Sequence, residues 1–128
     1  MIEDYFRHIA SYLASADIVH FSSITYDKRS SYVGFIRGNI YFLDGSFLHL
    51  REFVNVQYGI ERYMYVYQYQ SSTGVFIFRY DNTPHFADLS TFPHHRHAGG
   101  ETTVMAAMPP DLPTIFSEVR RYMTDTML

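Results

Sequence analysis

The fold is decided by residues 32–56, whose sequence is YVGFIRGNIYFLDGSFLHLREFVNV. Two runs rich in β-branched and aromatic residues, 32–43 and 46–56, are joined here by Asp44-Gly45. An Asp-Gly pair between two apolar runs is a strong signal for the tight turn of a β-hairpin. The stretch therefore predicts two antiparallel strands.

Three more strands are predicted on the two sides of this hairpin. Residues 18–28 precede it with a short, β-rich pattern, and residues 60–70 and 75–81 follow it, separated by a turn that contains Gly74. Strands that are joined in this way by short connections form a meander. The sequence therefore predicts five antiparallel strands in chain order.

A helix is predicted at each end of the chain. Residues 4–15 place apolar side chains at three- and four-residue spacing, with acidic residues in the first turn, where the helix dipole favours them. After Pro109 and Pro110, Asp111 can cap a second helix. Its apolar face consists of Ile115, Phe116, Val119, Tyr122 and Met123. The predicted fold class is α+β, a five-stranded antiparallel meander with an N-terminal and a C-terminal helix.

The composition bounds the size and the location of the protein. With 128 residues, 47% of them hydrophobic, the chain is long enough for one core and too short for two, so we expect a single domain over residues 1–128. No apolar run approaches the roughly 20 residues needed to cross a bilayer, and Glu3 and Asp4 stand where a secretory signal needs positive charge. There is no cysteine for a disulfide. A cytoplasmic protein without membrane contact is therefore expected.

One segment of the chain is dense in titratable side chains. Residues 82–100 contain two prolines and paired glycines, which predicts a long loop, and long ordered loops often carry function. The segment contains four histidines and an arginine, His85, His94, His95, Arg96 and His97, and Arg79 and Asp81 stand at its entrance. Imidazole can act as base or acid near neutral pH, and a guanidinium can stabilise a phosphorane. The set suits cleavage of RNA: one group takes the 2′-hydroxyl proton and another protonates the leaving 5′-oxygen.

Two other interpretations of these histidines stay open. The loop can simply be anchored by ring stacking and hydrogen bonds, with its histidines exposed. His95-x-His97 would also place two imidazoles on one side of an extended segment, where Asp81 or His85 can complete a metal site. The formal net charge of −3 argues against a broad basic surface, so nucleic acid would have to bind at a local site.

Aromatic side chains form two alternating stripes in the predicted sheet. Tyr63, Tyr65, Tyr67 and Tyr69 occupy every second position of one strand, and Phe76, Phe78 and Tyr80 do so in the next. A packed sheet face explains both stripes, but exposed rings would stack on bases or meet a protein partner. The sequence does not choose, because the opposite faces of both strands are also apolar.

Two polar features of the hairpin also invite a functional interpretation. Asp44-Gly45-Ser46 is similar to the Gly-Ser of nucleotidyltransferases, but no pair of carboxylates two residues apart follows it to hold metals, so we interpret it as the turn. His49, Arg51 and Glu52 interrupt an otherwise apolar strand, where burial is costly without partners. These three residues therefore lie either on an exposed strand or in a site.

Three segments of the chain together resemble the TumE-like family. They are GNIYFLDGSFLHLREF at 38–53, FRYDNTPH at 78–85 and TFPHHRH at 91–97. The combination of Arg-Tyr-Asp-Asn, a nearby Pro-His and a later Phe-Pro-His-His-Arg-His is far more specific than any one segment. The resemblance implies a small α+β toxin of a type II toxin–antitoxin pair, which acts on RNA and is paired with a helix-turn-helix antitoxin.

Carried over residue by residue, the resemblance implies a candidate site. Its catalytic residues would be Glu52, Arg79, Asp81, His85, His94, His95 and His97, with Arg51, Tyr80 and Arg96 binding substrate. One position departs from the family pattern, since Phe86 stands where a second histidine is usual after Pro-His. We therefore expect an endoribonuclease that uses its His-rich loop for general acid/base catalysis, with no metal and no cofactor. The competing hypothesis is a non-enzymatic interaction module, whose aromatic sheet face binds a protein partner or a second copy in a homodimer.

Overall fold

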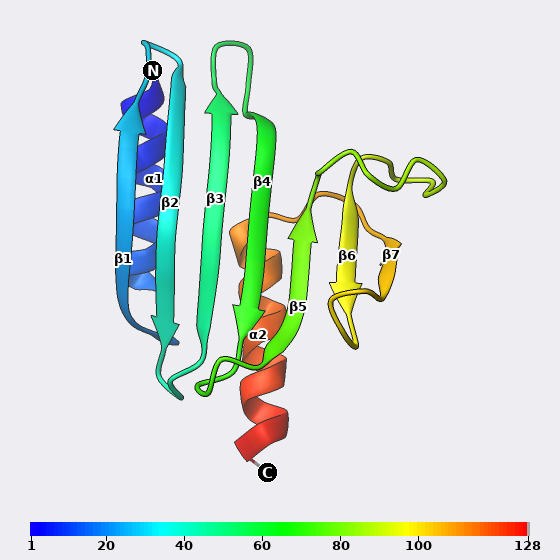
Figure 1. The fold of residues 1–128 in the computed structure, drawn as a ribbon. Coiled ribbons are helices and arrows are strands. Elements are labelled where there is room, and N and C mark those ends of the chain that lie inside the picture. The colour runs from blue at the N-terminus through cyan, green and yellow to red at the C-terminus, as the bar shows by residue number, and fades with distance from the viewer. Residues whose placement is uncertain (128) are drawn as a thin grey trace.

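The computed structural model describes residues 1–127, which form two helices and seven strands. In chain order these are α1 (Ile2–Ser15), β1 (Val19–Lys28), β2 (Val33–Phe42), β3 (Phe47–Asn55), β4 (Glu61–Gln70), β5 (Phe76–Asp81), β6 (His95–Ala98), β7 (Val104–Ala106) and α2 (Leu112–Met127). The strands form one sheet in the order β1 to β7, and each pairs antiparallel with the next (Figure 1). The predicted α+β meander with a helix at each end is confirmed. Neither helix, over the residues described, is long and apolar enough to span a membrane.

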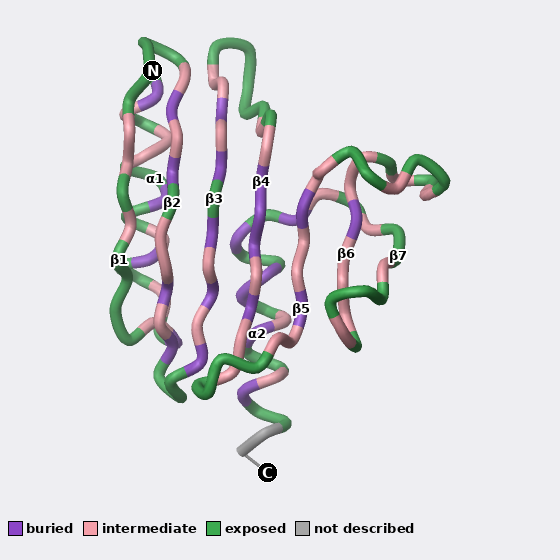
Figure 2. Tube along the Cα trace, viewed as in Figure 1, coloured by how far each residue is buried: buried purple, intermediate pink, exposed green. Residues whose placement is uncertain are grey.

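Both helices lie on the same face of the sheet. In Figure 1, α1 lies behind β1 and β2, while α2 lies behind β4 and β5. Every second residue of β3, from Leu48 to Val54, and every second residue of β2 except Gly38 is buried under this layer. Arg37 and Arg51 belong to the alternate set and are exposed. Figure 2 shows buried stretches alternating with less buried ones along β2 and β3. The sheet therefore has a covered face, which packs against the helices, and an open face.

The turn and the helix cap predicted from the sequence are confirmed. Gly45 has a φ of 85°, and Oδ1 of Asp44 accepts a hydrogen bond from the backbone N–H of Ser46 at 3.0 Å, which closes the hairpin between β2 and β3. Oδ1 of Asp111 accepts a hydrogen bond from the backbone N–H of Thr114 at 2.9 Å. This bond satisfies one of the backbone donors that the first turn of a helix leaves free.

The predicted count of five strands is wrong, because β6 and β7 add two more. β6 lies within residues 82–100, which were predicted to form a loop, and pairs antiparallel with β5. Its polar residues show no apolar alternation because they find polar partners on both faces of the sheet. His95 and His97 approach Asp81, and Arg96 pairs with Glu118 of α2. β6 is thus held by backbone pairing and polar contacts.

Three tyrosines of β4 form the centre of the core. Tyr65, Tyr67 and Tyr69 are at most 1% exposed. Their hydroxyls hydrogen-bond, in that order, with Nδ1 of His94 at 2.9 Å, the Glu52 carboxyl at 2.5 Å and Oγ of Ser46 at 2.8 Å. A buried hydroxyl costs free energy unless it is hydrogen-bonded, so these partners make tyrosine acceptable here. For these three residues, the interpretation as a packed sheet face is confirmed.

Two register shifts turn one residue of each aromatic stripe, Tyr63 and Phe76, away from the covered face. The shift between β3 and β4 lies next to Phe53, and Tyr63 packs against Phe53 with 47% of its surface exposed. The shift between β4 and β5 lies next to Gln70, and Phe76 lines a pocket beside Arg79. An extra residue in one strand breaks the regular alternation of faces. The prediction that all four tyrosines share one face is therefore wrong for Tyr63.

Gly38→Ala is expected to lower the free energy of unfolding by at least about 2 kcal/mol, measured by chemical denaturation. Gly38 has a φ of 153°, and a Cβ added there would lie 2.0 Å from the backbone oxygen of Ser23 in the paired strand β1. A paired backbone cannot move aside as a flexible side chain can. Gly59→Ala is the matched control, since Gly59 also has a positive φ, of 116°, but a Cβ there meets nothing within 4 Å. Equal losses in both variants would contradict a role for the clash.

Candidate functional site at Asp81, His95 and His97

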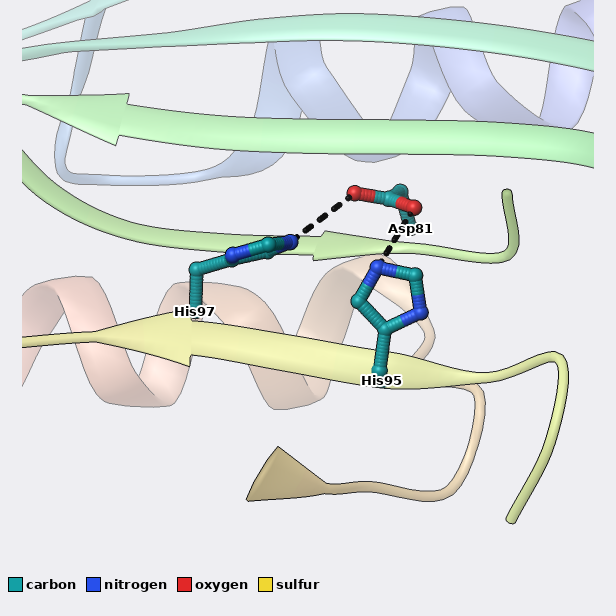
Figure 3. Close-up of side chains that lie close together, drawn as sticks. All are labelled: Asp81, His95 and His97. Carbon is teal, nitrogen blue, oxygen red and sulfur yellow. Dashed lines mark ion pairs between the residues drawn. The ribbon is translucent and has the colours of Figure 1, made fainter. Parts of the chain in front are cut away.

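Two histidines of β6 and one aspartate of β5 meet on the open face. In the register of these strands, Asp81 lies opposite His95 and Arg79 lies opposite His97. Because side chains alternate along a strand, His95 and His97 point to the same side, as their spacing predicts for an extended segment. Figure 3 shows both imidazoles turned toward the carboxylate of Asp81. We call these three residues the Asp–His–His cluster.

The cluster holds three atoms of ligand type close together. Nε2 of His95 lies 2.9 Å from Oδ1 of Asp81, and Nε2 of His97 lies 3.6 Å from Oδ2. One atom from each residue can be chosen so that all three lie within 4.8 Å of one another. Asp81 and His95 are each 2% exposed, whereas His97 is half-buried. An acid and two imidazoles at these distances can transfer a proton or bind a cation.

The far edge of each imidazole is fixed by the backbone. Nδ1 of His95 donates a hydrogen bond to the carbonyl oxygen of Pro93 at 3.0 Å, and Nδ1 of His97 donates one to the carbonyl oxygen of Glu101 at 2.7 Å. A carbonyl oxygen can only accept, so Nδ1 carries the proton in both rings. In the neutral form of each ring, the lone pair is therefore on Nε2, the atom that faces Asp81.

Asp81 is held by donors on both of its oxygens. Oδ1 accepts the backbone N–H of Thr83 at 2.9 Å, and Oδ2 accepts Nε–H of Arg79 at 2.8 Å. Burial alone would raise the pKa of Asp81, but the hydrogen bonds from Thr83 and Arg79, with the charge of His95, outweigh burial and leave the pKa below its ordinary value. The carboxylate is therefore ionised at neutral pH.

The cluster opens into a pocket of about 330 Å³. Arg79 and His85 line this pocket together with the cluster, so five of the predicted catalytic residues converge here. Phe86 lies edge-on against both imidazoles, with its ring centroid 4.8 Å from that of His95 and 5.9 Å from that of His97. The residue that departs from the family pattern therefore borders the cluster directly.

Cationic and amide side chains extend from the pocket across the open face. Strand register places His49 and Gln68 in line with Arg79, and Arg37 directly opposite Arg51. Nη1 of Arg79 donates a hydrogen bond to Gln68 Oε1 at 3.1 Å. Burial, and then the positive charges of Arg51 and Arg79, lower the pKa of His49, which favours its neutral form. We call the three arginines Arg37, Arg51 and Arg79 the cationic row.

Two of the predicted catalytic residues lie on the covered face, apart from the cluster. Glu52 is 2% exposed and accepts hydrogen bonds from the hydroxyls of Tyr5 and Tyr67. The imidazole of His94 stacks on the ring of Tyr65, with centroids 5.8 Å apart and planes within 7° of parallel. Both residues therefore make their contacts with the tyrosines of the core side.

The predicted substrate-binding residues are divided between the two faces. Arg51 is exposed on the open face. Tyr80 and Arg96 lie on the covered face and both contact Glu118 of α2: the Tyr80 hydroxyl donates to Oε1 at 2.7 Å, and Nη2 of Arg96 pairs with Oε2. The Arg96 guanidinium also lies 5.4 Å from the centre of the Phe78 ring. The observed contacts of Tyr80 and Arg96 thus join the sheet to α2.

Three residues that support the cluster were missed by the sequence analysis. Glu101 acts through its backbone carbonyl, which carries no side-chain signal, and Thr83 acts through its backbone N–H and its side chain. Gln68 acts through its side-chain amide on Arg79. The sequence carries a signal for Gln68, because it is a polar residue among the tyrosines of β4, but its register with Arg79 is seen only in the fold.

The fold and the site define a small α+β protein whose open sheet face carries a buried carboxylate and two oriented imidazoles. The family model described as Toxin TumE matches residues 9–127 of this chain, which include the whole cluster. The chain belongs to the TumE toxin family, and the resemblance inferred from its motifs is confirmed. Searches among curated proteins and among solved structures find no match. Membership of a toxin family implies a cognate antitoxin.

Proposed function

We propose that this TumE-family toxin cleaves RNA and that the reaction takes place in the pocket at the Asp–His–His cluster. The observation that carries the proposal is the convergence of Arg79, His85 and the cluster in one open pocket. Cleavage of a phosphodiester by its own 2′-hydroxyl needs groups that move protons and a cation that stabilises the phosphorane. RNA rather than DNA is the substrate, because only RNA carries the 2′-hydroxyl.

We assign the two proton transfers of this reaction to histidines that line the pocket. In the protein without a bound ion, Nε2 of His97 takes the proton of the 2′-hydroxyl as that oxygen attacks phosphorus. The bond from phosphorus to the 5′-oxygen then breaks, and His85, in its protonated form, gives a proton to the leaving oxygen. Arg79 uses Nε and Nη1 on Asp81 and Gln68, which leaves Nη2 for the phosphate. The products are a 2′,3′-cyclic phosphate and a 5′-hydroxyl, so no further reactant is needed.

The cationic row supports a polyanionic substrate. Arg37 and Arg51 lie directly opposite each other in register, both are exposed, and neither has an ion pair with any residue of 1–127. Like charges directly opposite on a sheet destabilise it, so the pair is best explained by an anion that neutralises both. Tyr63 and Phe53 lie farther along the same face, where rings can stack on unpaired bases. A local track of this kind reconciles RNA binding with the net charge of −3.

The open face is also the surface where we place the antitoxin, which we propose to be a helix-turn-helix protein. It exposes 51% of Phe21 and 47% of Tyr63, and exposed aromatic rings suit a protein interface. An antitoxin on this face would cover the cationic row and block RNA. The same exposed rings favour the second candidate function, a non-enzymatic interaction module in which the histidines only anchor β6.

Induction of the protein in bacterial cells tests the proposed function. Growth is expected to stop, and new RNA ends carrying 2′,3′-cyclic phosphates should appear and be detected by end mapping. Co-expression of the antitoxin should suppress both effects. Arrest without new RNA ends would overturn RNA cleavage and favour the interaction module.

A further inference from the structure

The short contact between His95 and Asp81 needs a proton or a cation between the two side chains. Since Nδ1 of each ring donates to a carbonyl oxygen, the neutral rings direct their Nε2 lone pairs at the carboxylate of Asp81. For His95 this contact is only 2.9 Å long. A lone pair facing an anionic oxygen at this distance in a buried site is repulsive, unless a cation or a proton lies between them.

We propose that the cluster binds one divalent transition-metal ion, with Zn²⁺ as the best fit, through Nε2 of His95, Nε2 of His97 and the carboxylate of Asp81. Two imidazole nitrogens and one carboxylate oxygen suit zinc and its neighbours, whereas Mg²⁺ prefers oxygen ligands and water. A hydrogen bond from the other ring nitrogen to a backbone carbonyl is the arrangement that orients metal-binding histidines. Both histidines of the cluster have it.

The spacing of the three residues fits a metal ion with little rearrangement. Ligand atoms about 2.0 to 2.2 Å from one ion are roughly 3 to 3.6 Å from each other. The imidazole-to-carboxylate distances are 2.9 Å from His95 to Oδ1 of Asp81 and 3.6 Å from His97 to Oδ2, so each ring has one carboxylate oxygen at about this spacing. The whole set lies within 4.8 Å, so small side-chain rotations bring all three onto one ion. β5 and β6 hold the residues in adjacent register positions, and the backbone therefore need not move.

Three protein ligands would leave at least one coordination position open, and the three residues that would hold the ion line the same pocket as Arg79 and His85. An open position distinguishes catalytic zinc sites from structural ones. The role of the ion in RNA cleavage rests on the proposed function, although its binding does not. In the loaded protein His97 would hold the ion, which would lower the pKa of the 2′-hydroxyl so that its proton passes to a water molecule in the open pocket, while Arg79 and His85 keep their roles. The bonds formed and broken stay the same.

Titration calorimetry of the purified, chelator-treated chain with Zn²⁺ tests the site. One ion per chain is expected to bind with a dissociation constant of about 1 μM or below, and Mg²⁺ should not compete. His97→Ala should weaken binding by at least about 100-fold. His94→Ala is the matched control, because His94 lies three residues from His97 but contacts Tyr65 on the covered face. Asp81→Asn is a second ligand variant, and circular dichroism establishes that each variant is folded.

Absence of stoichiometric Zn²⁺ binding by the parent chain would overturn the proposal. The space between Nε2 of His95 and Oδ1 of Asp81 would then hold a proton, carried by a charged His95. Equal affinities of the folded His97→Ala and His94→Ala variants would overturn the proposal as well. The proposed function is tested separately by RNA cleavage. A chain that cleaves RNA but binds no metal overturns the metal site alone, whereas a chain that binds zinc and leaves RNA intact supports the site and overturns RNA cleavage.

Discussion

His97→Ala is expected to lower the rate of RNA cleavage by at least about 100-fold and to abolish growth arrest. The variant removes the imidazole that lies 3.6 Å from Asp81 and is the more exposed ring of the cluster. The expectation holds whether Nε2 takes up the 2′-hydroxyl proton or binds a cation, because alanine does neither. It is measured as the initial rate with purified protein on a defined RNA, and as growth after induction at matched expression.

His94→Ala provides the control for that experiment. It removes a histidine from the same motif, but one whose ring lies against Tyr65 on the other side of the sheet. Its cleavage rate per folded molecule should stay within a few-fold of the parent. If the folded His94→Ala variant loses as much activity as His97→Ala, the reaction does not take place at the cluster.

The hairpin and the helix ends could be predicted because each depends on a few adjacent residues. Asp44 and Gly45 form their turn through a contact two residues away, and Asp111 caps α2 through one three residues away. Signals of this range can be read directly from the sequence.

β6 could not be predicted, because its strand conformation depends on a partner strand and not on its own residues. His95-Arg96-His97-Ala98 has neither apolar alternation nor high β-propensity. Its pairing with β5 and its polar contacts to Asp81 and Glu118 exist only once the fold has formed.

The sequence predicts which residue types form the candidate site, but not which face of the sheet each residue lies on. His94 and His95 differ by one position, and so do Arg51 and Glu52, yet in each pair one residue faces the covered side and the other the open side. Successive residues of a strand point to opposite faces, so a set of neighbouring polar residues cannot all join one site. Which of the two faces the helices cover is decided by tertiary packing.

Glu52→Ala is expected to lower the free energy of unfolding by about 3 kcal/mol, the largest stability effect that we predict for a polar residue. The carboxyl accepts hydrogen bonds from the buried hydroxyls of Tyr5 and Tyr67, and the variant leaves both without an acceptor. Arg62 would also lose a nearby negative group. Burial lowers the pKa of its guanidinium, but Tyr67 and Glu52 raise it by more, so the pKa lies above its ordinary value. Denaturant unfolding of the purified variant measures the loss.

Glu52→Gln separates a structural role of this residue from a catalytic one. The amide keeps the shape of the side chain and one oxygen acceptor, so it should lose less stability than alanine. Because Glu52 lies on the covered face and the cluster on the open face, cleavage per folded molecule should be unchanged. A Glu52→Gln variant of parental stability that cleaves RNA far more slowly would contradict this assignment and place Glu52 in the catalytic set that the family resemblance implies. Unchanged cleavage would instead mean that the role of Glu52 is structural, as the hydrogen-bond acceptor of Tyr5 and Tyr67 in the core.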